Sequence, residues 1–503
     1  DAAANIVGGP EHSTLSNDAF RSREFDFMLA NPPYGKSWKR DLERMGGKAG
    51  IKDPRFVIQH ADDPEYSLLT RSSDGQMLFL ANMVSKMKHG TSLGSRIAEV
   101  HNGSSLYTGD AGQGESNIRR YLIESDWLEA IVALPLNLFY NTGIATYVWV
   151  LTNRKPEHRR GQVQLIDATT WFRPLRKNMG KKNCELSPED IQRICDTFLK
   201  FEETPQSKLF PNAAFGYWKG KVERPLRLHS QLTLPRIGTL RFASGDEDIR
   251  AALYDELGDA LFEDFASVRK QLEKLVEDWG KADSEDDKEE GDGSAKKSLP
   301  EKKKRKLLDP DTWKRDAFLV HTATRIRDEL GGDLFPDHNV FLDKLSDAVK
   351  TLGIKLAASD HKLIVNAVSW RDENAPPIIR KIHKPGKLRP DPLRGLYLGS
   401  ALSTKAHLPV VEYEPDPELR DYEQIPLLEE GGIEAFIRRE VLPYTPDAWI
   451  VEADTKIGYE VSFTRHFYQP PQLRTLAEIS ADILALEQET EGLLSKITGG
   501  KNP

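Results

Sequence analysis

The residues best suited to chemistry in this sequence are Asn31-Pro32-Pro33-Tyr34, which follow a short apolar run ending at Ala30. An exocyclic amino group on an aromatic ring or a carbonyl is a poor nucleophile, because its lone pair is delocalised. The amide oxygen of Asn31 and the backbone carbonyl of Pro32 can accept its N–H bonds and stabilise the positive charge that develops as it attacks a methyl sulfonium. The prolines stiffen the loop, and Tyr34 offers an aromatic face for a base. The tetrapeptide therefore predicts group transfer to a planar amino group without a metal.

The alternative interpretation of this tetrapeptide is a turn that ends a strand and exposes a tyrosine. The surrounding pattern favours a site, because strands and helices alternate from residue 1 to about 218 and predict an α/β doubly wound domain. A strand that stops at a double proline also fits, since proline cannot donate to the ladder. The predicted helices are Gly75–Lys88, Ser116–Ser125 and one capped by Ser187-Pro188, and the predicted strands are Arg96–His101, Ala130–Leu134, Ala145–Leu151 and Val163–Ile166. The third of these strands is apolar throughout, which is typical of burial on both faces.

Composition excludes several classes of protein. The chain has 503 residues, with 39% hydrophobic and 29% charged residues, which is typical of an ordinary globular protein of two or three domains. No stretch approaches the roughly 18 apolar residues of a membrane helix. Cys184 and Cys195 lie far from any His or Cys cluster, so we expect neither a disulfide nor a zinc site, and a cytoplasmic location. The net charge of −8 counts against a freestanding DNA-binding protein, but not against a subunit whose partner supplies much of the DNA contact.

Beyond residue 220 the sequence predicts three further regions. Residues 221–312 hold a long amphipathic helix, Glu247–Trp279, and a charged low-complexity linker, 281–306. The basic run Lys302–Lys306 is interpreted as solvated surface rather than as a DNA contact. Residues 313–470 form a mixed α/β accessory region. Residues 471–503 begin with a capping box at Thr475 and continue as a long helix with a heptad seam, which requires a helical partner.

The tetrapeptide resembles the catalytic motif of amino-group methyltransferases. Further segments resemble, in the right order, the modification subunits of type I restriction–modification systems. The resemblance is close from residue 5 to about 220, weak in the middle of the chain, and returns from about 440 to 497. The segments that carry it are Thr14–Asp18, Phe25-Asp26, Gly94–Ala98, His101–Ser104, Thr108–Asp110, Trp127–Pro135, Leu138–Thr146 and Gly458–Arg465.

This resemblance implies a Rossmann-like domain that transfers a methyl group from S-adenosylmethionine to N6 of an adenine in DNA. The adenine must be flipped, because a bound sulfonium cannot reach N6 in line inside a paired stack. The resemblance assigns catalysis to Asn31–Tyr34 and places Asp18 near the cofactor or the base, although Asp18 also suits a simple turn. The implied partners are double-stranded DNA, a restriction subunit and a specificity subunit. The terminal helix would bind the specificity subunit through residues such as Ile483 and Leu486.

The sequence departs from the family at the glycine-rich cofactor loop, which should precede the tetrapeptide. Residues 1–30 offer only Gly8-Gly9-Pro10, which does not fit. Gly109–Gly114 is glycine-rich but lies downstream, and is interpreted as a loop before a helix. The chain is therefore interpreted as a methyltransferase domain, 1–220, that lacks its N-terminal cofactor-loop part. We expect this piece alone to be inactive.

Two features leave alternatives open. Arg173, Arg176 and Lys177, beside Trp171 and Phe172, suit either a DNA-backbone contact or a basic surface loop. The tetrapeptide would equally suit methylation of another planar amino group, in a protein glutamine or in RNA. A non-catalytic assembly subunit that keeps the fold is a third interpretation, against which the intact tetrapeptide argues.

Overall fold

The computed structural model describes residues 5–9, 11–140, 142–282, 299–384, 386–399, 409–468 and 475–497. The chain divides into two compact units. The first contains Asp1–Lys219, Gln424–Gly432 and Lys456–Pro503, and the second contains Gly220–Glu423 and Ile433–Thr455. The sequence grouped residues 313–470 into one accessory region, whereas the structure distributes them between both units.

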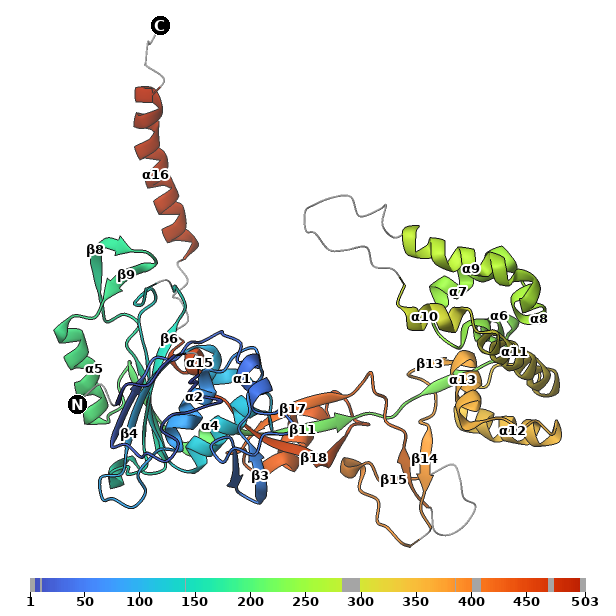
Figure 1. Ribbon diagram of the computed structural model, residues 1–503, viewed down its shortest axis with the longest axis horizontal. Helices are drawn as coiled ribbons and strands as arrows, with labels where there is room; N and C mark the ends of the chain where they lie inside the picture. Colours follow the sequence, from blue (N-terminus) through green and yellow to red (C-terminus); the bar gives the residue numbers. More distant parts are fainter. Residues whose placement is uncertain are drawn as a thin grey trace. The chain divides into compact units, whose positions relative to one another are not determined.

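A six-stranded sheet in the order β1-β4-β6-β5-β7-β10 forms the centre of the first unit (Figure 1). Strands β1, β4, β5 and β7 point the same way, and β6 runs antiparallel to both of its neighbours. We call the edge at which these four strands end the carboxyl edge. The strands are β1 (Phe27–Ala30), β4 (Arg96–Asn102), β5 (Leu128–Ala133), β6 (Thr146–Thr152), β7 (Gln162–Asp167) and β10 (Ser207–Pro211).

The central sheet of the predicted α/β domain is mixed, and its antiparallel strand β6 is a feature that the sequence did not predict. A parallel connection needs a crossover, usually a helix. Residues 134–145, which join β5 to β6, contain no helix among those that the structure describes, so the chain returns antiparallel. The burial predicted for β6 on both faces holds for one: Trp149 and Leu151 are fully buried, whereas Val148 and Val150 are partly exposed.

Helices cover the two faces of this sheet unequally. On one face α2 (Gln76–Val84) and α4 (Gly114–Glu124) bury the main core of the unit. On the other face α5 (Pro188–Lys200) packs against β5 and β7. The predicted start of α5 is confirmed, since Ser187 accepts from the backbone N–H of Asp190 and forms a capping box. At the outer strand β1, Phe27 and Leu29 are 66% and 83% exposed, so this face is open there.

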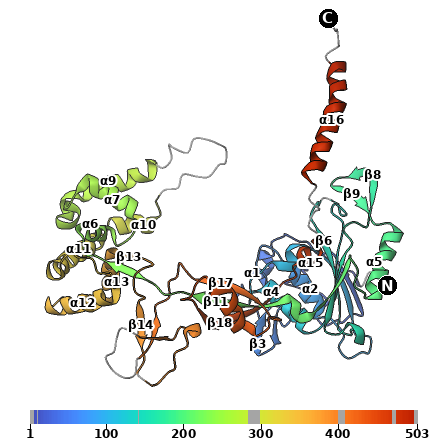
Figure 2. The ribbon, with the colours of Figure 1, turned by 180° about the vertical axis from the view of Figure 1, so that it is seen from behind.

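Smaller elements complete the first unit. A two-stranded hairpin, β8 (Arg173–Met179) and β9 (Lys182–Glu185), follows β7 and projects from the unit near α5 (Figures 1 and 2). The remaining elements are α1 (Lys39–Arg44), β2 (Val57–His60), β3 (Asp63–Ser67), α3 (Ser104–Tyr107), α15 (Phe463–Phe467) and α16 (Leu476–Ile497). In the described ranges no helix has both the length and the apolarity needed to cross a membrane.

The second unit is mainly helical and corrects the prediction of one long helix over Glu247–Trp279. Three helices occupy this region, because the chain turns at Gly258, whose φ of +60° favours glycine, and again at Asp264. The linker is also shorter than predicted, since residues 301–306 begin a helix whose Leu307 is buried. The helices are α6 (Leu234–Gly238), α7 (Glu247–Leu257), α8 (Ala260–Glu263), α9 (Phe265–Ala282), α10 (Glu301–Leu307), α11 (Pro310–Leu330), α12 (His338–Thr351) and α13 (Ala358–Val368).

Short sheets accompany these helices. Strands β12 (Leu228–Ser230) and β13 (Ser369–Arg371) pair antiparallel, as do β14 (Ile379–Ile382), β16 (Val410–Tyr413) and β15 (Tyr397–Leu398) in a second sheet. A third sheet has the order β17-β11-β18, and each of its strands passes from one unit to the other. These strands are β11 (Gly216–Glu223), β17 (Asp421–Pro426) and β18 (Trp449–Tyr459).

Candidate active site

The tetrapeptide lies at the carboxyl edge, directly after β1. Pro32 is buried and Tyr34 partly buried, whereas the Asn31 side chain is exposed and has no hydrogen-bond partner in the part of the chain that the structure describes. Burial raises the pKa of Tyr34, so its phenol stays protonated and neutral at physiological pH. The site thus offers an uncommitted amide oxygen beside a neutral aromatic ring.

The loop after the tetrapeptide is fixed by residues that precede α2. The Trp38 N–H donates to the carbonyl of Ser72 at 3.0 Å, and the Trp38 indole N–H donates to the carbonyl of Arg71 at 2.8 Å. Trp38 is buried, and a side chain at Gly75 would meet its ring at 3.2 Å. These contacts restrict the loop on its downstream side, as β1 does on its upstream side.

Gln76 connects α2 with the end of the neighbouring strand β4. Its amide nitrogen lies 2.8 Å from Asp74 Oδ2, 2.7 Å from Asn102 Oδ1 and 2.9 Å from Ser104 Oγ. Its amide oxygen accepts from the backbone N–H of Asn102 at 3.2 Å. Gln76 is buried, so this network holds the first residues after β4 at the carboxyl edge, beside the tetrapeptide.

A buried polar group lies inside β4 itself. Glu99 and His101 are fully buried, with Glu99 Oε2 3.3 Å from His101 Nε2. Neither carboxylate oxygen of Glu99 has a hydrogen-bond partner among the described residues, and the indole N–H of the adjacent Trp149 is also unpaired there. Burial raises the pKa of Glu99 above its ordinary value, despite the opposing effect of His101.

Arg119 of α4 joins the carboxyl edge to a segment more than three hundred residues away in sequence. Its guanidinium donates to the carbonyls of Tyr459 at 2.6 Å, Ser105 at 2.9 Å and Thr108 at 2.8 Å. The side chain is fully buried, and burial lowers the pKa of Arg119 to about 10. Arg119 therefore stays charged at physiological pH and holds three segments of the first unit together.

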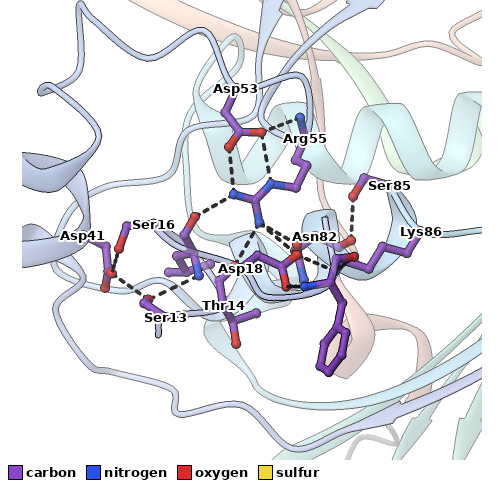
Figure 3. A network of polar contacts seen from close by, with 12 residues as sticks. Ser13, Thr14, Ser16, Asp18, Asp41, Asp53, Arg55, Asn82, Ser85 and Lys86 are labelled. Atoms are coloured by element: carbon purple, nitrogen blue, oxygen red, sulfur yellow. Dashed lines mark hydrogen bonds and ion pairs between the residues drawn. The ribbon is translucent and has the colours of Figure 1, made fainter. Parts of the chain in front are cut away.

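Asp18, the residue placed near the cofactor by the sequence, lies in a closed network (Figure 3). Its carboxylate forms an ion pair with Lys86 and lies 3.5 Å from Arg55 Nη1. The side chain is 6% exposed, and Arg55 also donates to Asp53 and Asn82. The carboxylate of Asp18 thus joins residues 14–20 to Arg55 and to Lys86, which follows α2, and its role near a cofactor or base stays a prediction.

The glycine cluster Gly109–Gly114 is also explained by packing. A Cβ at Gly114 would lie 2.1 Å from the carbonyl oxygen of Leu69, and one at Gly109 would lie 2.9 Å from Glu115 Cβ. The cluster is the loop before α4 that the sequence predicted. No residue in the described ranges is therefore assigned to a methyl donor.

The structure separates the remaining candidates by location. Arg173, Arg176 and Lys177 lie on β8, which follows β7 in the chain. Three strands, β4, β6 and β5, separate β7 from β1, the strand before the tetrapeptide. Lys303, Lys304 and Lys306 of the other basic run contact Asp246, Glu301 and the carbonyl of Ser244, all within the second unit. The sequence did not single out Gln76 or Arg119, and their only signal was a polar residue on an otherwise apolar helical face.

Comparison with known proteins adds a family to this geometry. Residues 3–214 match the family described as N-6 DNA Methylase. The methylase subunit of the type I restriction enzyme MjaVII from Methanocaldococcus jannaschii is 34% identical over 192 residues, which are 38% of this chain and 30% of the relative. The MjaIX methylase subunit from the same organism is 28% identical over 186 residues, which are 37% and 30%.

A solved type I restriction-modification methyltransferase subunit from Streptococcus thermophilus is 25% identical, with a TM-score of 0.31 over 40% of this chain and 37% of that chain. The present chain spans 30% of the length of both Methanocaldococcus jannaschii relatives. Residues 3–214 match the family described as N-6 DNA Methylase and are similar to the methylase subunits of type I restriction enzymes.

Proposed function

We propose that this chain forms the catalytic part of an S-adenosylmethionine-dependent DNA methyltransferase that modifies N6 of a flipped adenine. The observation that carries the proposal is the uncommitted amide of Asn31 at the carboxyl edge, within residues that match the N-6 DNA methylase family. Its setting is a type I restriction–modification complex in the cytoplasm.

The residues at the edge suit the chemistry of an exocyclic amino group. The Asn31 amide oxygen and the Pro32 carbonyl would each accept one N–H bond, which favours the pyramidal, charge-bearing nitrogen of the transition state. Tyr34 would stack on the flipped base as a neutral ring. The methyl donor supplies an electrophilic methyl group. No residue here is assigned to hold that donor, so we expect the chain alone to be inactive and to bind S-adenosylmethionine weakly.

The proposed partners are double-stranded DNA, a specificity subunit and a restriction subunit. We assign the specificity subunit to α16, on which Ile479 and Ile483 are 41% and 55% exposed. Exposed apolar residues at this spacing suit a helical partner. An RNA or a protein glutamine as substrate, and a non-catalytic scaffold, remain the competing functions.

The test combines the complete methylase subunit, its specificity subunit, duplex DNA and methyl-labelled S-adenosylmethionine, followed by nucleoside analysis. We expect the label in N6-methyladenine and its loss in Asn31→Ala. Asn374→Ala, which removes an exposed amide from a turn of the second unit, is the matched control and should leave labelling unchanged. Methyl label found only in RNA or protein, or no label with the unaltered subunit or the Asn374→Ala control, would overturn the proposal.

A further inference from the structure

The hairpin β8–β9 carries a local charge opposite to that of the whole chain. Residues 173–185 contain five cations and one carboxylate, whereas the chain as a whole has a net charge of −8. Arg173 pairs with that carboxylate, Glu185, at 2.8 Å. Arg176, Lys177 and Lys181 are exposed and have no ion-pair partner within the described ranges. Three unpaired cations on one hairpin repel one another, and the described residues offer no ion pair that compensates their charge.

The hairpin is attached to the carboxyl edge by contacts at its base. Cys184 is buried and its thiol donates to the carbonyl of Leu136 at 3.1 Å. Lys182 Nζ donates to the carbonyl of Leu138 at 2.7 Å, and the Asn183 N–H donates to the carbonyl of Asn137 at 3.2 Å. Residues 136–138 lie in the segment that follows β5, which ends at Ala133 at this edge. The attachment makes the hairpin a fixed arm rather than a free loop.

The arm and the tetrapeptide lie along the same edge of one sheet. Strand β5 is the third strand along from β1, and neighbouring strands are about 4.8 Å apart, which gives a separation of roughly 14 Å between their ends. This distance is similar to the roughly 12 Å width of the major groove of DNA. The base of the arm is therefore about one groove width from the tetrapeptide along this edge, which suits a contact with phosphates that flank a base at Asn31.

We propose that the hairpin β8–β9 binds the DNA backbone beside the target base, through Arg176, Lys177 and Lys181. This inference rests on the proposed function and adds the contact that positions the duplex. Arg173 is not part of the contact, because Glu185 already neutralises it. The arm contributes affinity without sequence preference, since phosphates carry no base information.

The test measures binding of a short labelled DNA duplex to the full chain by fluorescence anisotropy over a range of salt concentrations. The variant Arg176→Gln/Lys177→Gln removes two cations from the arm. The matched control, Arg160→Gln/Lys200→Gln, removes two exposed cations at the opposite edge of the same sheet, before β7 and at the end of α5. Far-ultraviolet circular dichroism and thermal unfolding verify that both variants fold like the unaltered chain.

Each phosphate contact contributes about 0.9 to the slope of log K against log salt, so the arm variant should lower the slope by about 2 and weaken binding on the order of tens-fold near 0.1 M salt. The control should bind like the unaltered chain, and Arg176→Lys/Lys177→Arg should retain binding. Equal losses in arm variant and control, no DNA binding by the unaltered chain at low salt, or tighter binding to an RNA stem would overturn the inference.

The two proposals fail in different ways. Asn31→Ala leaves the cations of the arm in place, so it should bind duplex normally while losing methylation. Loss of binding in the arm variant, combined with an absence of any DNA methylation, would retain the arm and reject the proposed function. Methylation that depends on Asn31, in an enzyme whose arm variant binds like its control, would do the reverse.

Discussion

Replacing Arg119 by methionine tests whether the carboxyl edge depends on the distant segment around Tyr459. Methionine keeps the length and apolar volume of the side chain but removes all three donors. The carbonyls of Ser105, Thr108 and Tyr459 then lose a charged partner in a buried position. The backbone N–H of Val461 donates to the carbonyl of Leu106 at 2.8 Å, between the same two segments. Hydrogen exchange of this amide therefore reports on the separation of the Tyr459 segment from residues 105–108.

The cost follows from the bonds that are lost. Hydrogen bonds to charged groups contribute about 1.5–3 kcal/mol each. The variant also removes the desolvation penalty of the buried guanidinium, which offsets several kcal/mol of that loss. A net loss of about 3 kcal/mol remains, which is a large part of the roughly 5–15 kcal/mol that stabilises a domain. At about 1.4 kcal/mol for each factor of ten, protection of the Val461 amide against hydrogen exchange should fall on the order of 100-fold.

Hydrogen exchange followed by mass spectrometry resolves this effect by segment. The control is Arg120→Met on the same helix, which breaks the i,i+4 pair with Glu124 and the contact of the guanidinium with the Tyr66 ring and should cost about 1 kcal/mol. We expect Arg119→Met to lose protection at residues 103–108 and 457–463, with little change in the second unit. Equal exchange in the two variants, or a loss spread evenly over the first unit, would refute the assigned role of Arg119.

Three further predictions concern the site and the assembly. In the complete methylase subunit with its specificity subunit and duplex DNA, Asn31→Ala should lower the initial rate of methyl transfer by on the order of 100-fold or more, because one preorganised acceptor is lost; a rate within a few-fold of the unaltered enzyme would contradict this. Burial raises the pKa of Glu99, so the folded state holds its proton more tightly and stability is lost as the pH rises above about 4.5. Glu99→Gln should therefore gain stability relative to the unaltered chain in thermal scans from acid to neutral pH, and parallel curves would refute the shift. Ile479→Glu/Ile483→Glu should abolish co-purification with the specificity subunit without lowering the thermal stability of the isolated chain, because both side chains are already exposed; unchanged assembly would reject α16 as the contact.

The sequence predicted local elements of the first unit well, because their signals are themselves local. The double proline after Ala30 ends β1, because proline has no backbone N–H to donate to a neighbouring strand. Ser187 caps α5, because its side chain accepts from a free backbone N–H of the first helical turn. The antiparallel direction of β6 was not predicted, because an apolar strand has the same composition in either direction. It depends on the path of residues 134–145, which carry no crossover helix in their described part.

Residue roles were harder to predict than elements, because a charged side chain in sequence does not reveal its partner. Asp18 was a cofactor candidate from the resemblance, and the sequence did not reveal its ion pair with Lys86, which lies 68 residues further along the chain. Gly258 divides the amphipathic stretch Glu247–Trp279, although the apolar spacing continues through it. Gln76 and Arg119 were missed for the same reason, since each acts through carbonyl or amide groups brought together by the fold.

The first unit is larger in space than the match to the N-6 DNA methylase family. That match ends at residue 214, yet Tyr459, Val461 and Phe463 are buried in the same core as the strands of the sheet. Burying side chains of this size contributes about 1.5–3 kcal/mol each, and Arg119 and Ser116 fix the backbone of the returning segment by hydrogen bonds. The chain thus leaves the unit after residue 219, re-enters it over Gln424–Gly432 and returns to it again from Lys456. The compact first unit therefore includes returning segments of the chain that lie outside the residues matching the N-6 DNA methylase family.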